Sequence, residues 1–403
     1  MNLAYKRNIK IYHALNMASS CAFINGNWIF FWLRVMTIGQ LGVVDATAFA
    51  FGLFMEIPTG ALSDMIGKRW TLIMSMFLNG LGFFIMGAAD SIWGIVVGFW
   101  FTQTAWAFYS GAADAFAYDS LKAIGEESRY DKVISFTGSL SIFTVGLSSL
   151  IGGWMYHIDQ RFPHYAWGFA LFIGFFIALW AKEPPMDAVK FTLKSYINQL
   201  SQGFKQLARP ELRYFTPLIF AILGVHYLFI FGFIQPAMAT DFGFYADEQS
   251  VVFSIMGFTS ALTLLLVPFM RKRISDMRGL VLLALTFTGL YFLATTHPPM
   301  LVGMLILIAI RSVGGLSSSW ASIVVNREIP SEYRSTTLST VALLSKVPYI
   351  VTAMIAGRLA ENGQFALFYW GIIVFLIIMV AGVSIAYRIY HKQPTHLETA
   401  PTS

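Results

Sequence analysis

The chain has 403 residues, of which 57% are apolar and only 12% are charged. This composition excludes an ordinary soluble domain, in which roughly 25% of the residues are charged. The net charge of +6 does not indicate nucleic-acid binding, because the basic residues are spread through short polar gaps between apolar runs. The single cysteine, Cys21, excludes an internal disulfide and a thiolate metal cluster. We expect an all-α integral membrane protein without a metal site.

Twelve apolar runs, each bounded by charged or turn residues, follow one another along the chain. A helix needs ~20 mostly apolar residues to cross a bilayer, so each run predicts one transmembrane helix. The runs cover residues 11–33, 41–62, 70–89, 91–117, 133–155, 165–181, 214–236, 250–270, 279–296, 299–325, 336–357 and 365–387.

The distribution of basic residues predicts that both termini are cytoplasmic. With that orientation, only Arg34, Arg161 and Arg358 fall on the outer side, and Arg311 and Lys346 fall within helices. All the other Lys and Arg residues then lie in cytoplasmic segments, as the excess of positive charge on the cytoplasmic side of membrane proteins requires.

The longest polar interval, residues 182–213, is amphipathic and predicts a surface helix on the inner leaflet. It divides the chain into an N-terminal six-helix bundle (1–181), a cytoplasmic amphipathic linker (182–213), a C-terminal six-helix bundle (214–391) and a cytoplasmic tail (392–403). A short repeat supports this division. Ser-Asp-Met-Ile-Gly follows the second predicted helix, and Ser-Asp-Met-Arg-Gly follows the eighth.

The most specific motif lies at residues 60–69, between the second and third predicted helices. It places two glycines and an acid beside two cations, at Gly60, Asp64, Gly67, Lys68 and Arg69. The glycines permit a tight reversal, and the charged groups offer contacts that one conformation makes and another breaks. The motif resembles the G-x-L-x-D-R/K-x-G-R/K-R/K sequence of the major facilitator superfamily, and only Met65 departs from it.

The resemblance implies a fold of twelve helices in two six-helix bundles and a role for this motif in closing the cytoplasmic face. By the same resemblance, Asp64 would approach the positive N-terminal end of the eleventh helix. Arg69 would pair with an acid at the inner end of the fourth helix, for which Asp119 is the candidate. The departure at Met65 leaves one contact of this gate open.

Further segments, 56–60, 110–121 and 326–339, resemble a bacterial efflux-type branch of the superfamily. Two features limit the inference of efflux. The fourth predicted helix lacks the arginine of many proton-coupled members, and Gln103 is its nearest polar candidate. The fifth has Gly152 and Gly153 of the antiporter pattern G-P-x-x-G-G but lacks the proline.

Ionisable residues inside a span cost ~2.5 to 3.5 kcal/mol at a helix centre, so each is a candidate functional residue. Glu56 either carries a coupling proton or forms a conformational lock with a neighbouring helix. Asp114 is either a second proton site or part of the gate. Arg311 and Lys346 either hold an anionic group of the substrate, influence proton binding at the carboxylates, or form ordinary interhelical pairs. Pro348, just after Lys346, predicts a kink because proline lacks the backbone donor.

Aromatic and polar residues of several predicted helices are candidates for a central cavity, although Trp and Tyr also gather at membrane interfaces. His226 either titrates near neutral pH or is a packed, hydrogen-bonding residue, and the packed alternative is the more frequent one. The candidates are Asn16, Asn25, Asn27, Trp28, Trp32, Trp106, Tyr109, His226, Tyr227, Gln235 and Trp320.

These features predict a secondary active transporter that moves a small organic solute by alternating access, as proton-coupled efflux. No enzyme signature is present: the segment 60–69 lacks phosphate-loop spacing, and no H-E-x-x-H occurs. We expect no cofactor, a proton gradient as the energy source, and solute, protons and lipid as partners. The family resemblance implies a monomer in the bacterial inner membrane.

Two alternatives remain at this level. Uptake or exchange of an anionic metabolite or siderophore would use the two cations in the C-terminal half. A membrane sensor or scaffold that kept the fold and lost transport is the other, although a static scaffold has no use for the gate motif.

Overall fold

The chain folds into helices throughout the part that the computed structural model describes, residues 2–185, 192–210, 212–330 and 333–391. The N-terminal half contains α1 (Asn2–Ser19), α2 (Trp28–Trp32), α3 (Ile38–Ile66), α4 (Lys68–Ala88), α5 (Ile92–Lys122), η1 (Glu127–Arg129), α6 (Tyr130–Ile158) and α7 (Phe162–Leu179). After α8 (Leu193–Leu207), the C-terminal half contains α9 (Thr216–Ile230), α10 (Ile234–Asp241), α11 (Ala246–Thr263), η2 (Leu264–Leu266), α12 (Val267–Arg271), α13 (Asp276–Ala294), α14 (Met300–Glu328), α15 (Arg334–Lys346), α16 (Pro348–Glu361) and α17 (Phe365–His391).

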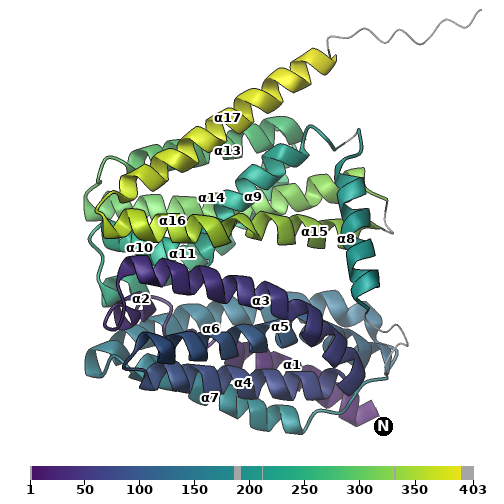
Figure 1. Ribbon diagram of the computed structural model, residues 1–403. Helices are drawn as coiled ribbons and strands as arrows, with labels where there is room; N and C mark the ends of the chain where they lie inside the picture. Colours follow the sequence, from purple (N-terminus) through teal and green to yellow (C-terminus); the bar gives the residue numbers. More distant parts are fainter. Residues whose placement is uncertain (1, 186–191, 211, 331–332, 392–403) are drawn as a thin grey trace, which may run out of the picture.

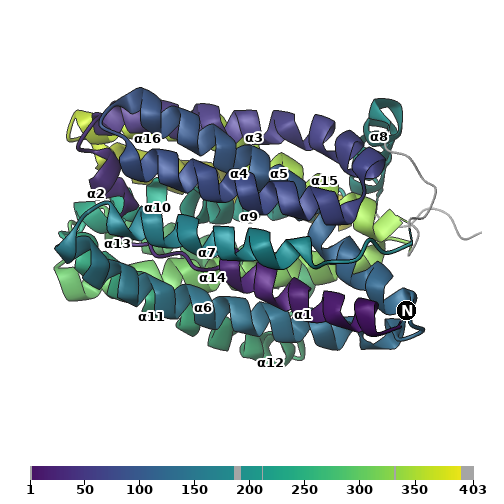
Figure 2. The same cartoon turned by 90° about the horizontal axis from the view of Figure 1, so that it is seen from below.

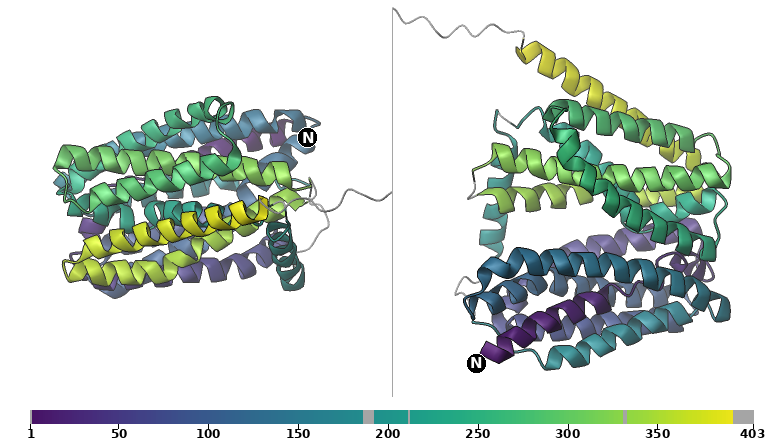
Figure 3. Two further views of the ribbon diagram at one scale, coloured as in Figure 1. Left: turned by 90° about the horizontal axis from the view of Figure 1, so that it is seen from above. Right: turned by 180° about the vertical axis from the view of Figure 1, so that it is seen from behind.

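The helices form two groups that lie side by side, α1 to α7 in one and α9 to α17 in the other (Figure 1). The views from below, from above and from behind show the long helices running in roughly the same direction (Figures 2 and 3). α8 lies across one end, where the N-terminus and the end of α17 also lie (Figure 1). We call this the inner end, because the topology prediction assigns it to the cytoplasm, and the opposite end the outer end. Linker residues 186–191 and the predicted tail 392–403 lie outside the described residues.

Nine helices of the described chain are long and apolar enough to cross a membrane, and the bent pair α9–α10 makes ten. α5 is long enough to cross a membrane but is less apolar than these helices, because polar and indole side chains interrupt its apolar sequence. The structure therefore confirms an all-helical fold with many candidate spans. Twelve spans with cytoplasmic termini stay a prediction.

Breaks interrupt several of the predicted helices. The prediction of a continuous helix over 11–33 is wrong, because α1 ends at Ser19 and α2 begins only at Trp28. α9 and α10 meet at 71°, beside Gly232 with a φ of 57°, a conformation that glycine adopts without steric cost. α16 begins at Pro348, where the proline predicts a kink.

Small residues let the two halves approach closely at the outer end. α3 crosses α16 at Gly42, where an added Cβ atom would lie 2.7 Å from the carbonyl oxygen of Ala353 and 3.0 Å from Cα of Gly357. α6 meets α11 where the Ser149 hydroxyl donates a hydrogen bond to the carbonyl of Ser250 at 3.2 Å. These crossings close the outer end between the halves.

Candidate functional site: three cavities between the halves

Three cavities adjoin one another along the interface between the halves. The aromatic cavity, toward the outer end, has a volume of about 370 Å³. The connecting cavity, about 280 Å³, shares Asp45, Phe99 and Gly232 with it. The inner cavity, about 440 Å³, reaches α8 and shares Glu56 and Lys346 with the connecting cavity. The halves are thus packed together at the outer end and hollow between them toward the inner end.

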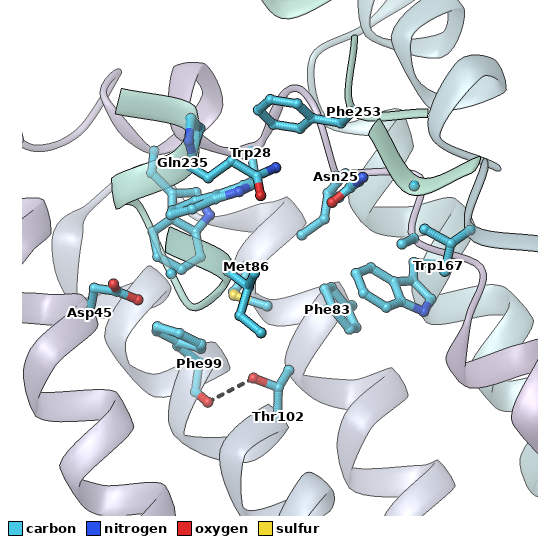
Figure 4. Close-up of a pocket in the computed structure, with 18 of the residues that line it drawn as sticks. Asn25, Trp28, Asp45, Phe83, Met86, Phe99, Thr102, Trp167, Gln235 and Phe253 are labelled. Atoms are coloured by element: carbon cyan, nitrogen blue, oxygen red, sulfur yellow. Dashed lines mark hydrogen bonds between the residues drawn. The ribbon is translucent and has the colours of Figure 1, made fainter. Parts of the chain in front are cut away.

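Aromatic rings form much of the wall of the aromatic cavity (Figure 4). The rings of Trp28 and Trp32 meet edge to face with their centres 4.8 Å apart, and Phe83 stacks on Trp167 at 4.2 Å. Apolar walls with a few placed polar groups are typical of sites for small organic molecules. The predicted cavity residues that line it are Asn25, Trp28, Trp32, Gln235 and Arg311.

Glu56 on α3 and Lys346 on α15 come from opposite halves and line the same two cavities. The Lys346 ammonium lies 5.5 Å from the ring centre of Phe231 and 5.8 Å from that of Tyr227, within the range of cation–π attraction. Trp106 lines the connecting cavity beside them. The structure therefore brings together four of the predicted residues, Glu56, Trp106, Tyr227 and Lys346.

Asp45 is a buried acid of these cavities that the sequence analysis overlooked. Its carboxylate accepts hydrogen bonds from the hydroxyl of Tyr349 on α16 and from the backbone N–H of Phe233 at 3.2 Å. The residue is only 2% exposed. Its position inside the predicted helix 41–62 was a sufficient signal, because an acid within a span is a functional candidate by default.

Asp114 contacts its own half of the molecule. Its Oδ1 accepts a hydrogen bond from the Tyr12 hydroxyl at 2.7 Å, which joins α5 to α1. Tyr109, five residues earlier on α5, is buried with 7% exposure. Neither belongs to the described lining of the three cavities. A role for Asp114 in the gate or as a second proton site stays a prediction.

His226 and Asn27 make packing contacts in this structure. His226 lies against α14, where a Cβ atom added at Gly314 would come within 2.0 Å of its Nδ1. This Nδ1 is buried and has no hydrogen-bond partner among the described residues, so whether His226 titrates or is a packed, hydrogen-bonding residue stays a prediction. The Asn27 side chain donates a hydrogen bond to the carbonyl of Phe23 at 3.0 Å, which stabilises the turns before α2.

Trp320 lies at the inner end of the C-terminal half, so its assignment to a central cavity is wrong. The ring is fully buried, packs against Gly279 and donates a hydrogen bond from Nε1 to the carbonyl of Asp276 at 3.2 Å. The Asp276 carboxylate forms ion pairs with Arg271 at 2.9 Å and with Arg327. The second copy of the Ser-Asp-Met repeat therefore holds α12, α13 and α14 together.

The gate motif surrounds the junction of α3 and α4. The predicted pair of Arg69 with Asp119 is wrong, because Lys68 forms the ion pair with Asp119. The Arg69 guanidinium instead donates a hydrogen bond to the carbonyl of Leu179 at 2.9 Å. Gly60 lies within α3, about two turns before the junction.

Glu183, just after α7, binds the first turn of α4. Its two carboxylate oxygens accept the backbone N–H groups of Lys68 at 2.8 Å and Arg69 at 2.9 Å. An acid is stabilising there, because the first N–H groups of a helix lack partners within it. Gly67 has a φ of 90°, and a Cβ atom added to it would lie 2.7 Å from Cδ of Glu183. The approach of Asp64 to α15 stays a prediction.

Comparison with known proteins identifies the family. The model of the Major Facilitator Superfamily matches residues 14–233, more than half of the chain. The chain belongs to this superfamily. This major facilitator is therefore a multi-pass membrane transporter rather than an enzyme.

Curated relatives are transporters as well. The inner membrane transport protein YajR of Escherichia coli is 24% identical over 340 residues, 82% of this chain and 69% of YajR. The multidrug efflux protein YfmO of Bacillus subtilis is 22% identical over 335 residues, 81% of this chain and 79% of YfmO.

Solved structures share the fold of this major facilitator. The nucleoside transporter NupG superposes with a TM-score of 0.76 at 13% identity, over 96% of this chain and all of NupG (100%). A bacterial homologue of the human lysosomal transporter Spinster, in an inward-facing and unoccupied conformation, gives 0.70 at 15% identity, with 97% of each chain covered.

Proposed function

We propose that this major facilitator exports a small organic solute in exchange for protons. The observation that carries the proposal is the placement of Glu56 and Lys346, one in each half, where the connecting and inner cavities meet. The name of the relative YfmO, a multidrug efflux protein, supports the outward direction. The volume of about 370 Å³ and the aromatic walls of the aromatic cavity support a small organic solute.

In this proposal Glu56 couples the proton to the movement of the halves. The ionised carboxylate attracts Lys346 and favours the approach of α3 and α15, because opposite charges interact strongly where water is scarce. A proton on Glu56 removes this attraction and favours the arrangement that is hollow at the inner end. Release of the proton to the cytoplasm, followed by solute binding, would then favour closure of the inner end and opening of the outer end.

A second candidate is uptake or exchange of an anionic solute, such as an acidic metabolite or a siderophore. The observation in its favour is that Arg311 lines the aromatic cavity. A guanidinium offers a carboxylate or phosphate two parallel hydrogen bonds, so an anionic group would be held there firmly. The charge of the accepted solute separates this candidate from export of neutral or cationic compounds.

The remaining features of the proposal concern the setting of transport. The proton gradient supplies the energy, with no cofactor. The protein works as a monomer, which is supported by cavities that both halves of one chain line. It resides in a bacterial inner membrane, which is supported by the relative YajR, an inner membrane transport protein.

Proton movement in sealed proteoliposomes with an internal pH dye tests the proposal. Lipophilic cations and then organic anions are added to the wild type and to Glu56→Gln. We expect a solute-triggered proton flux in the wild type that falls at least tenfold in Glu56→Gln. Glu127→Gln removes an exposed carboxylate outside the cavities and should leave the flux unchanged.

Each other result has a defined meaning. A flux that survives in Glu56→Gln contradicts the role of Glu56. A flux triggered by organic anions alone favours the second candidate. No flux with any solute, in protein that is folded and sealed in the vesicles, contradicts proton coupling.

A further inference from the structure

The contact between Asp45 and Tyr349 joins the two halves at the closed outer end. Asp45 belongs to α3 of the N-terminal half, whereas Tyr349 and Phe233 belong to the C-terminal half. Both side chains are buried, with 2% exposure for Asp45 and 0% for Tyr349. The donors to the carboxylate are a hydroxyl and a backbone N–H, both neutral groups.

The backbone is shaped to fit this contact. Gly232, at the break between α9 and α10, has no room for a side chain, because an added Cβ atom would lie 1.9 Å from both Oδ2 of Asp45 and the hydroxyl oxygen of Tyr349. The same segment of α3 crosses α16 where Gly42 faces Gly357. The hydrogen bonds to Asp45 and the closure of the outer end are therefore formed together, and opening must break both.

Few charged groups surround Asp45. Arg311 on α14 shares the aromatic cavity with it. Glu56 on its own helix and Lys346 on α15 share the connecting cavity. From α5 the neighbour is the neutral Gln103, which donates a hydrogen bond to the carbonyl of Ala48 at 3.2 Å. From α16 and the α9–α10 break the neighbours are Tyr349 and the Phe233 N–H.

We infer that Asp45 is a second proton-binding site, and that proton uptake there accompanies closing of the outer end. In the closed arrangement an ionised carboxylate is removed from water and meets only neutral donors, which is unfavourable, whereas a protonated carboxyl group is neutral and costs much less to bury. Opening exposes the carboxyl group to water, which stabilises the ionised form. Acidic conditions on the outer side therefore favour closing, and opening releases the proton.

The position of Asp45 gives its proton access from each side in turn. In the present arrangement the carboxyl group borders the connecting cavity, which adjoins the inner cavity. Separation of α3 from α16 would uncover it from the outer side. Asp45 thus adds a proton site at the outer closure to the proposed role of Glu56 at the inner end, and its behaviour is measurable without any solute.

Distances between the outer loops, measured by pulsed electron paramagnetic resonance, test the inference in the full-length protein in lipid nanodiscs. Cys21→Ser removes the single native cysteine. Spin labels at Gln160→Cys and Thr296→Cys then report on the exposed α6–α7 and α13–α14 loops, one in each half. We expect the long-distance population to shrink as pH falls from 8 to 5, with an open-to-closed ratio that changes by up to about tenfold per pH unit.

Variants at the contact identify the responsible group. Asp45→Asn, which is uncharged at every pH, should give the closed distances throughout and lose the pH response. Tyr349→Phe removes a donor to the ionised form but keeps the carboxyl group, so its outer end should close at a higher pH than that of the wild type. If Asp45→Asn does not fold, the shift in Tyr349→Phe tests whether the Asp45 carboxyl group is responsible for the pH response.

Four results would overturn the inference: a wild type without a pH response, a response unchanged in Asp45→Asn, a response abolished by Glu56→Gln instead, or a Tyr349→Phe midpoint equal to that of the wild type. None of these results depends on a solute, so failure here is distinguishable from failure of the proposed export.

Discussion

Lys68, the first residue of α4, forms an ion pair with Asp119 near the inner end of α5. The pair is largely shielded from water, with side-chain exposures of 24% for Lys68 and 11% for Asp119. It links two consecutive helices of the N-terminal half and so stabilises the junction that carries the gate motif.

Asp119→Asn should destabilise the protein by about 2 kcal/mol, because the mostly buried Lys68 ammonium loses its counter-charge. Thermal unfolding in detergent measures the effect as a lower midpoint. The double variant Lys68→Met with Asp119→Leu should be less destabilised than Asp119→Asn, since an apolar pair leaves no charge uncompensated. A double variant that is worse than the single one contradicts this account.

Gly67→Ala should lower the unfolding temperature more than Gly125→Ala. Both glycines have positive φ, 90° and 72°, but nothing lies within 4 Å of a Cβ atom at Gly125, whereas Glu183 lies in the way at Gly67. Gly125→Ala therefore measures the backbone strain alone, about 1 kcal/mol. Equal effects of the two substitutions would show that Glu183 does not occupy this position.

Trp320→Phe should mainly affect the stability of the fold, whereas Trp28→Phe should mainly affect solute affinity. Trp320→Phe loses the hydrogen bond to the carbonyl of Asp276 and should lower the unfolding temperature without changing solute affinity. Trp28 lines the aromatic cavity, so Trp28→Phe should change solute affinity with a smaller effect on unfolding. Tryptophan fluorescence titration with a transported solute, beside thermal unfolding, separates the two effects.

Glu126, between α5 and η1, provides a pH-dependent contribution outside the membrane spans. The hydrogen bond from Arg129, with a further contribution from Lys6, holds the pKa of Glu126 below its ordinary value. The ionised form is thus favoured in the folded protein, so the stabilisation is present above the ordinary carboxyl pKa and is lost as pH falls through the lowered value. Glu126→Gln should slightly lower the unfolding temperature at pH 7 but not at acidic pH. A difference that persists in acid contradicts this origin.

Gly42→Ala should keep the outer end from closing fully, because its Cβ atom would meet the backbone of α16 at 2.7 Å. The outer-loop distance between labels at positions 160 and 296 should increase at every pH. Gly138→Ala in α6 is the matched control, since nothing lies within 4 Å of a Cβ atom there. The inner cavity should become smaller at the same time if the halves move as rigid units.

Much of the fold could be predicted because apolar length and basic charge directly reflect the thickness and asymmetry of a membrane. The break after Ser19 was missed because residues 21–24 are apolar, although Asn25, Gly26 and Asn27 directly before α2 form a turn signal in the sequence. Gly232 was a local signal for the bend between α9 and α10. A glycine in an apolar run is equally compatible with a straight helix, so it did not predict the bend by itself.

The candidate site was predictable one residue at a time. Glu56 and Lys346 each stand out as a charge within an apolar run, but their common cavities depend on how the halves pack. The error at Arg69 has a simple geometric origin. One position along a helix turns a side chain by about 100°, so the exact start of α4 decides that Lys68 faces Asp119.

The residues on the two sides of Pro348 face different acids of α3 across the interface between the halves. Lys346, on one side of it, faces the cavities that Glu56 lines, and Tyr349, on the other side, holds Asp45. Asp45 and Glu56 lie about 16 Å apart along α3, at 1.5 Å per residue. In the proposed alternation the segment around Pro348 would lie between the two closures, so that approach of Lys346 to Glu56 would accompany separation of Tyr349 from Asp45. By thermodynamic reciprocity, a proton bound at either end changes proton affinity at the opposite end.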